Sequence, residues 1–190
     1  MAFAFALSAF LLAADPKAAP EVKFTLPEDA GFPAPKKLVL VKAGTPGPGQ
    51  AKHQAVLEIP TLGKPVKLLP DAGPFDVWWV PKHDGMATKI LAKESFKTGI
   101  REIGLLEIVG GVRVRGDNRA RPQLLALAEP NAPGPDDEGY MPLATCKKFK
   151  QEMIVPAGFY ALWFRGGNSA RAEKLESRLK VLAGKIVEVD

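Results

Sequence analysis

The side chains that could carry out catalysis are few in this 190-residue chain, and their order matches no common catalytic pattern. There are two histidines, His53 and His83, and one cysteine, Cys146, which has no histidine or carboxylate next to it. The sequence contains no serine–histidine–aspartate order, no His-Glu-x-x-His zinc motif and no glycine-rich phosphate loop. We therefore predict that the protein is not an enzyme and needs no cofactor.

Carboxylates leave two alternatives open. A small hydrolase could work with a pair of carboxylates in a cleft, and Asp76, His83 and Asp84 are the groups whose geometry would test this. The run Asp136-Asp137-Glu138 supplies hard oxygen ligands of the kind that calcium prefers. It lacks the ligand spacing of an EF-hand loop, so we interpret it as a solvated charge run and predict no metal site.

Four arginines form the strongest candidate for a binding surface. They are Arg113, Arg115, Arg119 and Arg121, in the segment Val-Arg-Val-Arg-Gly-Asp-Asn-Arg-Ala-Arg. Alternation along a strand puts Arg113 and Arg115 on one exposed face. This face could bind an anionic polysaccharide, a phosphate or a lipid headgroup, and the alternative is a solvated strand edge that resists aggregation.

Three tryptophans are the candidates for a sugar-stacking platform. Successive strand residues point to opposite faces, so Trp78 and Trp79 cannot both enter the same core. Trp79 and Trp163 hold the same place in a repeated phrase, which predicts that both are core residues. Trp78 is then the candidate ligand-binding residue, and packing against the other module is the alternative.

The repeated phrase organises the whole chain. Residues 75–80 and 159–164 both follow a Pro/Gly turn with an aromatic and aliphatic run that is rich in strand formers. Around it, residues 112–115 resemble 38–41, residues 122–127 resemble 55–59, and residues 148–155 resemble 66–69. Residues 131–139 then read as an inserted loop. The pattern predicts an all-β protein of two tandem antiparallel β-sandwich modules, at residues 37–110 and 111–190.

One segment has two interpretations. Residues 169–182 taken alone fit an amphipathic helix, with leucines on one face. Their partner segment in the first half is a poor helix former, and we therefore predict a strand.

The N-terminal part differs in composition from the rest. Residues 1–14 are apolar and end in small residues, which predicts a signal peptide and an exported protein, although no lysine or arginine precedes the apolar run. Residues 15–36 are rich in proline and alanine and read as a tether. The remainder has an ordinary soluble composition, with 46% hydrophobic and 25% charged residues and a net charge of +5, which does not require nucleic acid as a partner.

The repeated phrase carries a family resemblance. A Pro-x-Gly turn, an aromatic strand ending in tryptophan, a polar turn and a later Thr-Gly-Ile or Ala-Gly-Lys turn occur once in each half. This arrangement resembles the carboxypeptidase regulatory-like and PEGA-type (transthyretin-like) β-sandwich modules. The resemblance implies a non-catalytic appendage of an exported or cell-surface protein. We accordingly expect a structural or binding protein of the cell envelope, with a module that binds anionic polysaccharide as the alternative.

Overall fold

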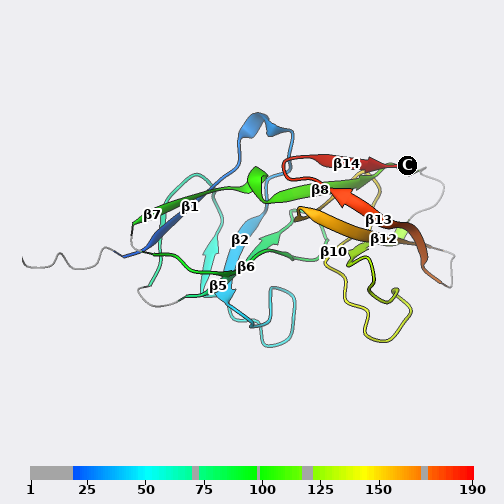
Figure 1. Cartoon of the computed structure of the whole chain (residues 1–190), viewed down its shortest axis with the longest axis horizontal. Helices are drawn as coiled ribbons and strands as arrows, with labels where there is room; N and C mark the ends of the chain where they lie inside the picture. Colours follow the sequence, from blue (N-terminus) through cyan, green and yellow to red (C-terminus); the bar gives the residue numbers. More distant parts are fainter. Residues whose placement is uncertain (1–18, 70–72, 98, 117–121, 168–170) are drawn as a thin grey trace, which may run out of the picture.

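The computed structural model describes residues 19–69, 73–97, 99–116, 122–167 and 171–190, and these form an all-β protein (Figure 1). Strands account for 48% of the described residues, and two 3-10 turns, η1 (Glu28–Ala30) and η2 (Leu105–Glu107), are the helical elements in them. The predicted fold class is confirmed. Among the described residues, no helix has the length and apolar character needed to cross a bilayer.

The first half of the chain forms two sheets. The smaller has the order β4-β1-β7, in which β1 pairs antiparallel with β4 and parallel with β7. The larger is antiparallel, with the order β3-β2-β5-β6. The strands are β1 (Glu21–Thr25), β2 (Lys37–Lys42), β3 (Leu57–Ile59), β4 (Val66–Lys67), β5 (Phe75–Val80), β6 (Thr88–Glu94) and β7 (Ile100–Gly104).

The second half repeats this topology strand for strand. Its smaller sheet has the order β11-β8-β14, again with one antiparallel and one parallel pair, and its larger sheet has the order β10-β9-β12-β13. Each strand therefore has its equivalent seven strands later. The strands are β8 (Val109–Val114), β9 (Pro122–Ala128), β10 (Ala144–Cys146), β11 (Glu152–Pro156), β12 (Gly158–Gly166), β13 (Glu173–Val181) and β14 (Ile186–Val189).

The tether prediction is wrong for the described part of residues 15–36. Strand β1 lies inside this range, and Val22 and Phe24 are at most 1% exposed in the core of the first module. Short length and flanking prolines hid the strand from sequence analysis. Because β1 is the equivalent of β8, residues 112–115 repeat β1 and not residues 38–41, and residues 122–127 repeat β2 and not residues 55–59.

The expected equivalence of Trp79 and Trp163 is wrong by one residue. Both β5–β6 and β12–β13 contain two consecutive register shifts, and these coincide only when Trp78 is matched with Trp163. In this register Trp78 faces Lys89 and Trp163 faces Lys174. The exposed Phe159 is then no equivalent of the buried Phe75, whose place Tyr160 takes.

Residues 131–139 are not an insertion but the counterpart of residues 44–52. Both loops contain Pro-Gly-Pro, and in both the glycine N–H donates to a side chain three residues on: Gly47 to Gln50 Oε1 at 2.7 Å, and Gly134 to Asp137 Oδ2 at 2.8 Å. Each loop lies over the outward tryptophan of its module. A Cβ on Gly47 would overlap the indole of Trp78, and one on Gly134 would come within 2.7 Å of Trp163.

Each module has its own core, and the two cores meet at the junction. The first core contains Phe24, Trp79 and also Ile154 from β11 of the second module. The second core is built around Leu125, Leu127 and Leu162. Figure 1 shows the modules end to end, with η2 joining β7 to β8 along the long axis. The segment 169–182 contains strand β13, which confirms the strand prediction for its described part; residues 168–170 lie outside the described residues.

If β1 belongs to the first core, Phe24→Ala should lower the free energy of unfolding by about 3–5 kcal/mol. The neighbouring Thr25→Ala is the control, because Thr25 lies on the outer face of the strand and should change stability by less than about 1 kcal/mol. Urea denaturation of both variants measures the difference. Equal, small effects would mean that β1 is not a core strand.

Gly47→Ala should destabilise the protein by about 1–3 kcal/mol, since the new methyl group overlaps the indole of Trp78. Trp78→Leu removes that overlap, so the double variant should be more stable than the sum of the two single effects by about 1 kcal/mol or more. A double-mutant cycle from denaturation curves gives this coupling. Simple additivity would contradict the contact.

Candidate functional site: a basic groove

The arginines predicted as a binding face are already engaged by carboxylates. Arg113 donates to Glu152 Oε1 and, at 3.0 Å, to Glu188 Oε1. Arg115 pairs with Glu188 and lies 3.7 Å from Asp190. These pairs cancel much of the positive charge of this face. Arg119 and Arg121 lie outside the described residues.

Trp78 is not an exposed platform. Its side chain is 7% exposed and packs with Val39, Val41 and Ala87 on the outer side of the larger sheet. The Pro-Gly-Pro loop of its own module covers it, and Lys89 Nζ lies 5.3 Å from the ring centroid. The side chain therefore does point away from the module's main core, as predicted from alternation, but a local loop takes the place that a ligand would need.

His83 and Cys146, two of the few side chains that could take part in catalysis, are both held in structural settings. His83 Nδ1 accepts a hydrogen bond from the Gly85 N–H, so its Nε2 carries the proton and donates to the Glu152 carbonyl at 2.9 Å. Both ring nitrogens are thus occupied by backbone partners. Burial raises the pKa of the Cys146 thiol to about 11, which keeps it protonated and a poor nucleophile at neutral pH.

Two carboxylates of the acidic run, Asp136 and Asp137, also have local partners. Asp136 pairs with Arg165 and accepts the Ala172 N–H at 2.7 Å, which fastens the loop to the β12–β13 hairpin. Asp137 caps the Gly134 N–H. These contacts explain the acidic run as part of the loop at residues 131–139, which covers Trp163.

Asp76 is the one buried carboxylate among the described residues of the first module and has three donors. It is 1% exposed, and it accepts hydrogen bonds from Lys89 Nζ at 2.6 Å, the Lys93 N–H at 2.9 Å and the Gly44 N–H at 3.2 Å. Burial by itself raises its pKa, but these hydrogen bonds and the charge of Lys89 outweigh burial and lower the pKa below the ordinary 3.8. Asp76 therefore stays ionised and links the bulged part of β6, at Lys93, to the loop at residues 44–52, which covers Trp78.

Three adjoining depressions form a groove on the surface of the protein. The module-1 depression has a volume of 760 Å³, the junction depression 460 Å³ and the module-2 depression 520 Å³. The first two share Ala34 and Lys82, and the last two share Glu152. We call the three together the basic groove.

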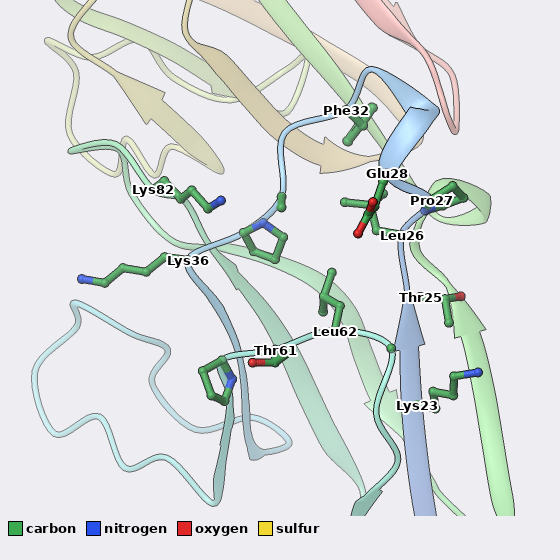
Figure 2. A pocket seen from close by; sticks show the side chains of 14 residues that line it. Lys23, Thr25, Leu26, Pro27, Glu28, Phe32, Lys36, Thr61, Leu62 and Lys82 are labelled. Atoms are coloured by element: carbon green, nitrogen blue, oxygen red, sulfur yellow. The ribbon is translucent and has the colours of Figure 1, made fainter.

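The module-1 depression lies between the β1–β2 connection and the β3–β4 connection. Figure 2 shows Lys36 and Lys82 on one side of it and Lys23 on the other. Lys23 pairs with Glu102 at 3.2 Å. Lys36 and Lys82 are exposed, and within the described ranges neither has a carboxylate in ion-pair distance. Apolar walls come from Leu26, Phe32, Leu62 and several prolines.

The junction and module-2 depressions continue the groove across both modules. His83 and Trp79 line the junction, where Phe32 meets Trp79 edge-on with ring centroids 6.4 Å apart. The module-2 depression is lined by Arg113, Arg115, Gly116, Lys150, Glu152 and Glu188.

Cations outnumber carboxylates along the groove, and neutral polar groups lie between them. The cations are Lys23, Lys36, Lys82, Arg113, Arg115 and Lys150, and the carboxylates in the lining are Glu28, Glu152 and Glu188. Glu102 and Asp190, outside the lining, pair with Lys23 and Arg115. Thr25, Thr61 and Gln151 add hydrogen-bonding groups. Such a lining attracts an anionic ligand and also accepts hydrogen bonds from its hydroxyl groups.

Sequence analysis found the module-2 end of this site and missed the rest. Lys23 lies on β1, whereas Lys36 and Lys82 lie on two different connections, and the three share no motif. The one signal that could have aligned the two halves correctly is the Pro-Gly-Pro tripeptide at residues 46–48 and again at 133–135.

The chain matches no protein-family model, no curated protein and no solved structure. The resemblance to carboxypeptidase regulatory-like and PEGA-type modules therefore stays a prediction.

Asp76→Asn should lower the free energy of unfolding by about 2 kcal/mol at pH 7, because it removes a charged acceptor of three hydrogen bonds. The folded-state pKa of Asp76 lies below its unfolded value, so its contribution is complete above pH 3.8 and is lost as the pH falls further. The difference between wild type and variant should shrink in that acidic range. Urea denaturation at several pH values measures it, and a constant difference would contradict the lowered pKa.

Proposed function

We propose that the protein is a non-catalytic binding protein of the cell envelope, whose ligand is an acidic polysaccharide lying along the basic groove. The observation that carries this proposal is the continuity of the groove over both modules, with Lys36 and Lys82 exposed and outside the described ion pairs. An extended ligand is favoured because the three depressions adjoin in a row. An anionic ligand is favoured because cations are in excess.

The mixed lining favours a polysaccharide over a nucleic acid. A nucleic acid carries closely spaced phosphates and is bound mainly by neutralising them. Carboxylates such as Glu28 and Glu152 inside the groove would repel phosphates, whereas they can accept hydrogen bonds from sugar hydroxyl groups.

Two further features support a non-enzymatic, exported protein. Both ring nitrogens of His83 are bonded to backbone groups, and the Asp76 carboxylate is bonded to Lys89 and two amides, so neither serves as a free base. The apolar residues 1–14 and the resemblance to exported β-sandwich modules favour an envelope location. Residues 1–18 lie outside the described residues.

Charge reversal at Lys36 and Lys82, which have no ion-pair partner among the described residues, should weaken binding to polygalacturonate, an acidic polysaccharide. We expect Lys36→Glu with Lys82→Glu to raise the Kd at least tenfold, since one charge contact at 4 Å is worth about 1 kcal/mol in water and reversal also adds repulsion. Wild-type affinity should fall with added NaCl, because exposed charge contacts are screened. Titration calorimetry in low salt measures both effects.

The matched control is Lys42→Glu with Lys52→Glu, which makes the same change of net charge. Lys42 is at the other end of β2 from Lys36, and Lys52 lies in the loop at residues 44–52. Neither lines the groove, so this variant should bind like wild type. Neutral dextran should not bind. An equal loss in both variants would reduce the effect to net charge, and single-stranded DNA binding as tightly as polygalacturonate would overturn the polysaccharide.

A further inference from the structure

The two ends of the basic groove are the same surface of the two modules. Lys23 on β1 pairs in register with Glu102 on β7, and Arg113 on β8 pairs in register with Glu188 on β14. Both pairs also form ion pairs between their side chains, at 3.2 Å and 3.0 Å. The cation on the first strand and the glutamate on the last strand are therefore a duplicated feature.

The backbone around these pairs is duplicated as well. The Gly63 N–H donates to the Phe24 carbonyl at 2.8 Å, and the Lys150 N–H donates to the Val114 carbonyl at 2.9 Å. Gly63 and Lys150 both have positive φ, at 82° and 64°, so the β3–β4 and β10–β11 connections turn in the same way. Gly63 lines the module-1 depression and Lys150 lines the module-2 depression.

The two depressions are copies of one surface, and their side chains differ at several positions. Thr25 in the first corresponds to Arg115 in the second, as the registers of β1 with β7 and β8 with β14 require. The first depression has its available cations on the connections, at Lys36 and Lys82, and the second has Lys150 on its connection. Both nevertheless place a cation–glutamate pair beside further cationic side chains.

We propose that the groove is a bivalent site, in which the module-1 and module-2 depressions bind equivalent acidic units of one polysaccharide chain. This rests on the proposed function. A ligand with a repeating unit can make similar contacts at both ends, and the junction depression between them, which shares lining residues with each, gives the chain a continuous path. The second contact of a bound chain is then intramolecular and raises its affinity without any new kind of contact.

Titration calorimetry with galacturonate oligomers of increasing length tests the proposal on the full chain. Short oligomers should bind weakly, with two molecules per protein, one at each depression. Above a threshold length, one molecule per protein should bind, with an affinity higher by about 100-fold. Lys36→Glu with Lys82→Glu should leave one short-oligomer site, at module 2, and Lys150→Glu with Arg115→Gln should leave one at module 1. Both variants should lose the length-dependent gain, and thermal unfolding followed by circular dichroism shows that each one folds.

The outcomes separate this inference from the proposed function. A single short-oligomer site in wild type, or affinity that rises smoothly with length and shows no threshold, would overturn bivalence and leave an acidic polysaccharide as the ligand. A length-dependent gain that survives in either double variant would also overturn it. No binding of long or short oligomers would overturn both proposals together.

Discussion

The parallel pairing of the first strand of each module with its last strand is the constraint on which the rest of the structure depends. A parallel pair cannot be closed by a hairpin, because the chain must cross to the other end before it returns. In each module five strands intervene, and four of them build the larger sheet that packs on the smaller one. The pairing of β1 with β7 and of β8 with β14 therefore defines where each module begins and ends. It also brings Lys23 beside Glu102 and Arg113 beside Glu188, at the two ends of the groove.

The larger sheets show how much sequence change this framework tolerates. Trp78 and Trp163 keep the same place, each under a Pro-Gly-Pro loop and each with a lysine over its ring. The packing of an indole directly on a glycine leaves no room for a side chain at the glycine, so the choice of residue is restricted at both positions. The buried Asp76, by contrast, has no carboxylate counterpart, since Ala161 holds the equivalent place. The two modules thus share the contacts that fix the loop and differ in how the neighbouring bulge is anchored.

Charge along the groove is governed by which cations the fold has already paired. Arg113 and Arg115 are the most conspicuous basic residues in the sequence, but Glu152, Glu188 and Asp190 lie against them. Lys36 and Lys82 are less conspicuous; they lie on the β1–β2 and β5–β6 connections, and among the described residues neither has an ion-pair partner. Surface ion pairs of this kind add little to stability, and their main effect here is to distribute the positive potential toward the lysines.

The sequence alone determined the fold class and the duplication. Short runs of strand-forming residues separated by prolines pack as sheets. A sequence repeat predicts a repeated structural unit, so the local pattern predicted two antiparallel-dominated modules. The strand assignment of residues 173–181 followed from the repeat in spite of its helical periodicity.

Tertiary structure decided the register, the module boundary and the site. A one-residue shift between β5 and β12 exchanges the two faces of a strand. The bulges in their pairing and the loop glycines packed on the indoles show that Trp78 and not Trp79 matches Trp163. Strand β1 is five residues long and is recognisable only by its partners β4 and β7. The groove joins side chains from connections far apart in the chain, and which of its cations lack a carboxylate depends on distances that no spacing in the sequence encodes.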